Sequence, residues 1–296
     1  MTQATQLLAS PDRYGEVKAG PRPFKAVKSV AFYVLIILIV AFYLFPTLWV
    51  VATSFKLPIE YFSIPPRWIP NSPTLMHYRK MFVDYDVAAA IKNSLIISMA
   101  NTVVTLAFAI PLAYAVARYR VGGGFLPGWI ISQRMLPPVA IVLPFFLVFR
   151  QLHLINTYQG MVIAYALFFI PFAVWILLGF FEDFPKEIQD AAMVDGSTEV
   201  GSLFRIVLPI LAGGIFVVAL LVFVYTWNDL LIALVLTRQE TRTLMVFFTT
   251  ALVSPTQEDF GVAAGAVTIG MVPAYLFALF GQRYLVRGLT MGGLKE

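Results

Sequence analysis

Few side chains in this 296-residue sequence have the type and spacing that covalent or metal chemistry needs. Cysteine is absent, and the two histidines, His77 and His153, lack the spacing of metal ligands, so we expect both at a surface or interface. No nucleophile stands beside a base, and no phosphate-binding motif of the form GxxxxGKS or GxxxxGKT occurs. The sequence therefore predicts no catalytic residue, no metal site and no cofactor bound by this chain.

Four residues inside otherwise apolar runs are the candidates for solute binding. Trp227, Asn228 and Asp229 lie in "YTWNDLLIALVLT", and Arg134 lies in "SQRMLPP". A polar group within a membrane span is costly and normally faces a cavity or a partner, and an indole face suits a sugar ring. Structural roles stay open as alternatives: Trp227 as an interfacial anchor, Asp229 as the cap of a kink, and Arg134 as a donor to carbonyls that neighbouring prolines leave free. An ion pair between Arg134 and Asp229 is a weaker alternative, because we expect them at different depths.

A short polar segment, residues 184–209, separates two of the most apolar runs. Its sequence is "FPKEIQDAAMVDGSTEVGSLFRIVLP". Pro185 suits the first turn of a helix, and Gly196 suits the left-handed residue that ends one. Ser197 is expected to cap a second short helix, and Pro209 to begin the next membrane span. The pattern predicts helix, glycine break, helix and proline along one membrane face.

Two alanines in this segment indicate what it contacts. Ala191 and Ala192 let another surface approach the helix backbone closely, and they lose no side-chain entropy on burial. A helix that lies on lipid headgroups would instead carry Trp, Phe or Leu opposite Lys and Arg. This small and acidic surface favours docking into a groove of another protein.

The surrounding sequence is that of an all-α, polytopic membrane protein. It is 59% hydrophobic and 12% charged, with a mean hydropathy of +0.81, whereas soluble domains carry about 25% charged residues. Apolar runs of about 20 residues cross ~30 Å of hydrocarbon. They occur at 30–53, 93–117, 125–149, 160–181, 210–236 and 261–286. We therefore expect six transmembrane helices.

Basic residues indicate which ends of the spans face the cytoplasm. The N-terminal tail, 1–28, is rich in Lys and Arg, "RYRVGGG" joins the second and third spans, and Arg283, Arg287 and Lys295 lie near the C-terminus. Because positive charge concentrates on the cytoplasmic side, both termini and segment 184–209 are expected there. The expected organisation is a disordered tail (1–28), a membrane domain (29–287) and a second tail (288–296). The net charge of +5 follows from this topology and requires no nucleic-acid partner.

The first outer loop, 54–92, mixes prolines with tyrosine, phenylalanine and tryptophan. This composition suits a compact surface that rests on the membrane or docks another protein.

Segment 184–209 resembles a family signature. Ala191-Ala192, Gly196 and Ile206-x-Leu208-Pro209, at this spacing, resemble the EAA signature of permease subunits in ATP-binding-cassette importers. The C-terminal "QRYLVRGLTMGGLKE" and "YTWNDLLIALVLT" are similar to MalG-type subunits of carbohydrate importers. The resemblance covers residues 30–296. Asp190 and Ser197 depart from it, because the family usually has Glu and Ala there, and these departures bear on fine matching to a partner.

The resemblance implies a coupling helix that sits in a cleft on a cytoplasmic ATPase. The coupling residues would be Glu187, Asp190, Ala191, Ala192, Asp195, Gly196, Leu208 and Pro209. The implied partners are an ABC ATPase dimer that holds ATP and Mg, a second homologous permease subunit, and a periplasmic or lipid-anchored solute-binding protein. The resemblance also implies the bacterial inner membrane as location and a carbohydrate, polyol or sugar derivative as solute.

An ion-coupled secondary transporter of a small polar solute is the alternative. Such a protein usually needs several acidic groups within its spans, and Asp229 is the only clear candidate. Segment 184–209 would also have no role in it.

Overall fold

The computed structural model describes residues 23–253 and 257–291, and within these ranges it is helical without a β-strand. The chain forms two units, residues 1–49 and 50–296. The first unit contains most of α1 (Pro23–Ser54), a long apolar helix with Pro46 inside it. Helix α1 thus begins within the tail expected at 1–28, whose residues 1–22 lie outside the described part, as do residues 292–296 of the expected C-terminal tail.

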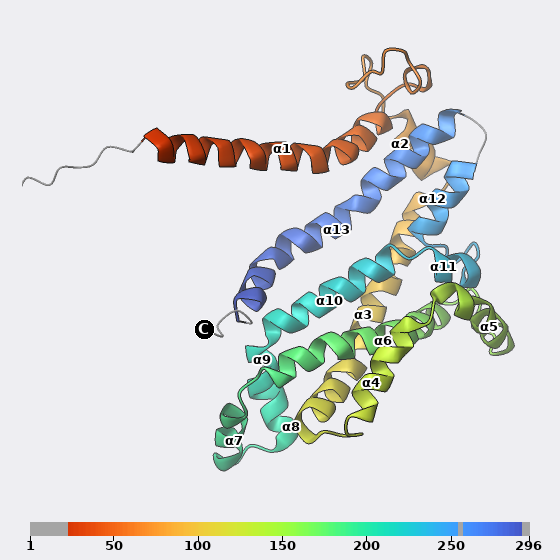
Figure 1. Cartoon of the computed structure of the whole chain (residues 1–296). Coiled ribbons are helices and arrows are strands. Elements are labelled where there is room, and N and C mark those ends of the chain that lie inside the picture. Colours follow the sequence, from red (N-terminus) through yellow and green to blue (C-terminus); the bar gives the residue numbers. More distant parts are fainter. Residues whose placement is uncertain (1–22, 254–256, 292–296) are drawn as a thin grey trace, which may run out of the picture. The chain divides into compact units, whose positions relative to one another are not determined.

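The second unit is a bundle of long helices with short helices at its two ends (Figure 1). Its elements are α2 (Met76–Val83), α3 (Val87–Tyr119), α4 (Phe125–Ser132), α5 (Pro138–Gln151), α6 (Tyr158–Glu182), α7 (Lys186–Val194), α8 (Glu199–Ser202), α9 (Leu208–Ile210), α10 (Ala212–Trp227), α11 (Leu231–Leu236), α12 (Leu244–Val253) and α13 (Gln257–Met291). Short 3-10 turns occupy Pro58–Glu60 and Gln133–Met135, and a π-helical turn occupies Leu203–Val207.

The centre of the second unit is the contact between α3 and α6, with α10 packed against α3 and α13 (Figure 1). Small residues make the central contact close: Ala109 and Ala113 of α3 and Ala164 and Ala173 of α6 are fully buried in one hydrophobic cluster. Such residues let helix backbones approach each other, which is how helices associate when lipid surrounds them. A second cluster joins α2, the start of α3, α10, α12 and α13.

The expected spans are confirmed in part. Within the described residues, four helices are long and apolar enough to cross a membrane, at 28–54, 87–119, 158–182 and 260–282. The expected third and fifth spans are not single straight helices. Residues 125–135 meet 138–151 at 92°. Residues 210–236 are divided between α10 and α11, and a 79° bend between 199–210 and 212–227 lies at the start of this span. The first bend follows from Pro137 and Pro138, since proline donates no hydrogen bond and forces Leu136 into an extended conformation.

Residues 55–75, within the segment expected as the first outer loop, fold around a buried carboxylate. The side chain of Glu60, 3% exposed, accepts hydrogen bonds from the backbone N–H of Asn71 at 3.0 Å, the backbone N–H of Leu57 at 3.3 Å and Nη1 of Arg67 at 3.3 Å. The hydrogen bond from Asn71 is the largest cause that holds the pKa of Glu60 below its ordinary value. The loop is thus an ordered surface with an ionised centre.

We expect this loop to loosen in acid. A carboxylate whose pKa is lowered by folding stabilises the fold above its unfolded pKa of about 4.3, and this contribution is lost as pH falls through the folded pKa. Hydrogen exchange of the Leu57 and Asn71 amides, corrected for intrinsic rates, is expected to show full protection at pH 7 and reduced protection at pH 3. In Glu60→Gln the protection should be lower at pH 7 and insensitive to pH. Equal pH dependence in both proteins would contradict this assignment.

His77 lies in the interior, which corrects the expected position at a surface or interface. It is fully buried, and its Nε2 lies 2.8 Å from the carbonyl oxygen of Lys56 and 2.7 Å from Oη of Tyr61. Gly261 of α13 passes so close that a β-carbon there would be 2.0 Å from that Oη. Tyr61 and His77 therefore pack the loop against α13, while Ile59, Ile64 and Trp68 of the same loop are exposed. His153 is exposed, as expected.

Candidate functional site

Helix α7 ends in a closed turn at Gly196. The glycine has φ +89°, its N–H donates to the carbonyl of Met193 at 3.1 Å, and the N–H of Ser197 donates to the carbonyl of Ala192 at 3.0 Å. This pair of bonds is the Schellman motif, in which the left-handed residue is nearly always glycine. The glycine break that the sequence predicts is therefore confirmed.

The cap of the next helix lies one residue later than expected. Thr198, not Ser197, is the N-cap of α8: its Oγ1 accepts from the N–H of Gly201 at 3.0 Å. Ser197 is unavailable because its own N–H closes the preceding turn. The chain then passes through the π-helical turn and α9, and Leu208 and Pro209 lie just before the 79° bend into α10.

The inner face of α7 is fastened to α3 by a glutamine that the sequence pattern did not single out. Nε2 of Gln189 donates to Oη of Tyr114, and Oε1 of Gln189 accepts from Nε of Arg118. Ala192, one turn further along the same face, is only 7% exposed. The expectation that both alanines face a partner is therefore half wrong, because Ala192 is buried against this chain.

The outer face of α7 is exposed and combines acidic and small side chains with Val194, which is 88% exposed. Glu187, Asp190, Ala191 and Asp195 are all exposed, and the structure gives none of their side chains a hydrogen bond within the described residues. These four residues, which we call the α7 outer face, lie at the end of the bundle where α6 ends and α8 begins (Figure 1). The arrangement is a rigid, anchored helix with an open surface that a second protein can contact.

Asp229 organises the break between α10 and α11, two helices that the sequence predicts as one. Its Oδ2 accepts from Oη of Tyr165 at 3.0 Å and from the backbone N–H groups of Ile232 at 3.0 Å and Ala233 at 3.4 Å. Of the alternatives that the sequence left open, the structure shows the cap of a kink. Arg134 is not its partner: that guanidinium lies 4.8 Å above the ring of Phe172.

Trp227 and Asn228 both line a cavity of about 460 Å³ between α10, α12 and α13. The indole of Trp227 is 3% exposed, and its Nε1–H donates to the carbonyl of Gly270 at 3.0 Å, so it packs α10 against α13 and is not an interfacial anchor. Asn228 is exposed, with its Nδ2 bonded to the carbonyl of Val224 at 2.8 Å. Arg134 lines a different cavity, of about 490 Å³.

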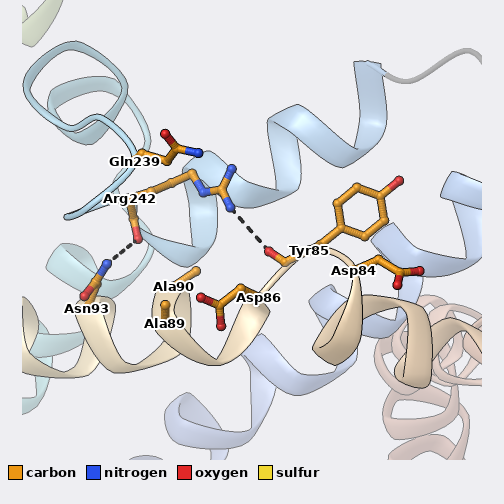
Figure 2. Close-up of a pocket in the computed structure, with 8 residues that line it drawn as sticks. All are labelled: Asp84, Tyr85, Asp86, Ala89, Ala90, Asn93, Gln239 and Arg242. Atoms are coloured by element: carbon orange, nitrogen blue, oxygen red, sulfur yellow. Dashed lines mark hydrogen bonds between the residues drawn. The ribbon is translucent and has the colours of Figure 1, made fainter.

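A further polar cavity, of about 340 Å³, lies at the start of α3 (Figure 2). Asp84 and Asp86 come from the turn before α3, and Gln239 and Arg242 from the turn between α11 and α12. Nη2 of Arg242 joins the two turns, since it donates to the carbonyl of Tyr85 at 3.4 Å (Figure 2). Nδ2 of Asn93 in α3 donates to the carbonyl of Arg242 at 3.0 Å (Figure 2). Sequence reasoning missed this site because its two halves are far apart in the chain and neither has a motif.

Three comparisons place the chain among known proteins. Residues 86–291 match the family model described as "Binding-protein-dependent transport system inner membrane component". The chain is similar to the sulfoquinovosyl glycerol transport system permease protein SmoH of Agrobacterium fabrum, at 33% identity over 85% of this chain and 89% of that protein. It is also similar to the trehalose/maltose transport system permease protein MalG of Thermococcus litoralis, at 31% identity over 92% of this chain and 98% of that protein.

The fold has a close structural neighbour. A chain in the crystal structure of a bacterial ABC transporter that imports the acidic polysaccharide alginate superposes with a TM-score of 0.74, covering 90% of this chain and 99% of that chain. At 20% identity this likeness concerns the fold alone.

Proposed function

Since the chain belongs to the family of binding-protein-dependent transport system inner membrane components, we propose that it forms half of the path by which an ABC importer moves a sugar or sugar derivative. The relatives SmoH and MalG, which are named for the transport of sulfoquinovosyl glycerol and of trehalose/maltose, support this solute class. The other half of the path would come from a second permease subunit, and a separate solute-binding protein would deliver the solute.

The observation that carries the coupling role is the α7 outer face. It would seat Ala191 in a cleft of a cytoplasmic ATPase dimer, where ATP and Mg act, with Glu187, Asp190 and Asp195 around it. Gln189 would transmit the movement to α3 through Tyr114 and Arg118. Leu208 and Pro209, before the bend into α10, would transmit it to a second long helix.

We propose six spans, with the third and fifth bent, within a membrane domain at 29–287 and with segment 184–209 and both termini in the cytoplasm. The long helices α3, α6 and α13 run toward the α7 end of the bundle, and α10 runs away from it, which supports this topology (Figure 1). Arg118 and Arg120 at that end fit the enrichment of basic residues on the cytoplasmic side. The bacterial inner membrane follows as location.

Solute contact is proposed for the cavity that Trp227 and Asn228 line. An exposed amide beside aromatic and aliphatic walls suits a sugar hydroxyl and ring. Asp229 would act indirectly, by holding the helix break that presents Asn228. Arg134 would line a separate part of the path.

Replacement of Ala191 by tryptophan tests the coupling role. We expect Ala191→Trp to reduce uptake into vesicles and co-purification of the ATPase by roughly tenfold or more, because overpacking a close contact costs about 1–3 kcal/mol. The matched control is Val200→Trp on α8, where the side chain is 65% exposed. Wild-type uptake by Ala191→Trp, or an equal loss in Val200→Trp, would contradict the proposal.

The energy source separates this proposal from an ion-coupled transporter. Uptake should persist in the presence of an ionophore and stop when the Walker lysine of the partner ATPase is replaced. Collapse of uptake by the ionophore alone would favour the ion-coupled alternative.

A further inference from the structure

A basic cavity of about 560 Å³ lies beside α7, at the ends of three helices. Arg118 is in the last turn of α3, Arg120 follows that helix, and Lys186 is the first residue of α7. Glu182, the last residue of α6, is the carboxylate in the lining. The cavity therefore presents an excess of positive charge where these helices reach the edge of the apolar bundle.

The cations of this cavity have unused donor capacity. Nη2 of Arg118 is buried without a hydrogen-bond partner in the described part of the chain, although Nε of the same guanidinium is bonded to Gln189. The side chains of Arg120 and Lys186 are exposed, and no hydrogen bond or ion pair of theirs occurs among the described residues. A buried guanidinium nitrogen without an acceptor is unfavourable, so an anion in the cavity would satisfy it.

The shape of the cavity suits a phosphate group with an apolar attachment. Gly123 and Gly124 line one side of the cavity. A β-carbon at either position would meet no atom within 4 Å, so this side leaves room for a ligand. Val116, Pro127 and Phe181 form an apolar wall. Arginine pairs and lysine bind phosphate oxygens by charge-assisted hydrogen bonds, and basic pockets between spans at a membrane surface bind anionic headgroups.

We propose that this cavity binds the phosphodiester headgroup of an anionic phospholipid. The chemistry of recognition is that of a phosphate, and the apolar wall beside the helix ends favours a lipid as its source over a free phosphate ester. Because Arg118 also holds Gln189, and Lys186 begins α7, the bound headgroup would fasten the base of α7 to the bilayer. The inference rests on the proposed function only for the leaflet involved, which would be the cytoplasmic one.

Lipid binding to the purified full-length protein tests this proposal. In native mass spectrometry, phosphatidylglycerol is expected to bind to the wild type with higher affinity than phosphatidylcholine or glycerol 3-phosphate. Arg120→Gln and Lys186→Gln should each weaken phosphatidylglycerol binding about fivefold, the value expected for one basic residue at a membrane surface. Both side chains are exposed, so the thermal midpoint without lipid should stay unchanged.

Arg205→Gln is the matched control, since it removes an exposed arginine from the π-helical turn near α7, outside the cavity. Its phosphatidylglycerol affinity should equal that of the wild type. Unchanged affinity in the Arg120→Gln/Lys186→Gln double variant, or an equal loss in Arg205→Gln, would overturn the site. Equal affinity for glycerol 3-phosphate would overturn the lipid as source. None of these results depends on uptake, so failure of the importer proposal would be recognised separately, by the ionophore and ATPase experiments.

Discussion

Gly196→Val is expected to abolish solute uptake while the protein stays inserted in the membrane. The left-handed φ of +89° is strongly unfavourable for a β-branched residue, at a cost of at least about 1–2 kcal/mol. No atom lies within 4 Å of a β-carbon at this position, so the cost is in the backbone and not in a clash. Relief of the strain would break the two hydrogen bonds that close α7 and would redirect the α7 outer face.

Gly196→Asn is the informative control, because asparagine adopts left-handed conformations more readily than other non-glycine residues. We expect this variant to retain the greater part of uptake, measured in vesicles at matched membrane levels. Undiminished uptake by Gly196→Val would show that the closure of α7 is irrelevant to coupling. Loss of inserted protein in Gly196→Val would instead place its effect on folding.

Asp229→Ala is expected to lower the free energy of unfolding by about 3 kcal/mol. The variant removes the acceptor of three donors at once, and the hydroxyl of Tyr165 belongs to a fully buried side chain. A buried donor without a partner costs about 1–3 kcal/mol, and the two backbone N–H groups of α11 lose their cap as well. Unfolding in mixed micelles, followed by circular dichroism, would measure the change.

The neighbouring Asn228→Ala is the matched control for this effect. Asn228 is exposed, and its side chain makes one solvent-exposed hydrogen bond, to the carbonyl of Val224, so its replacement should change the unfolding free energy by no more than about 0.5 kcal/mol. If the two alanine variants were equally stable, the helix break would not depend on the Asp229 carboxylate. Uptake by Asn228→Ala then reports on the proposed solute cavity without a stability defect.

The sequence predicts local structure correctly where neighbouring residues alone determine the backbone conformation. Gly196 follows an amphipathic turn and precedes a capping threonine, so the end of α7 is encoded within a few residues. The cap was misplaced by one residue because Ser and Thr have the same capping chemistry, and only the hydrogen bond of the Ser197 N–H to Ala192 distinguishes them. Pattern alone does not carry that information.

Hydropathy indicated which segments are apolar, but it does not report whether a helix is continuous. Residues 210–236 are apolar throughout, yet α10 ends at Trp227 because Asp229 accepts the first N–H groups of α11 and a hydroxyl from α6. Likewise, the inner face of α7 is fastened by Gln189, whose partners Tyr114 and Arg118 lie on another helix. Contacts of this kind join residues far apart in sequence, and periodicity within one helix cannot show them.

A free peptide with the sequence of α7 is not expected to form the helix that α7 forms in the intact chain. The helix has nine residues, and isolated helices shorter than about 12–15 residues are marginal in water. In the intact chain, the Gln189 bridge to α3 and the closing turn at Gly196 supply the order that so short a peptide lacks. A synthetic competitor copied from this segment would therefore need a covalent staple or a grafted scaffold before it presented the same surface.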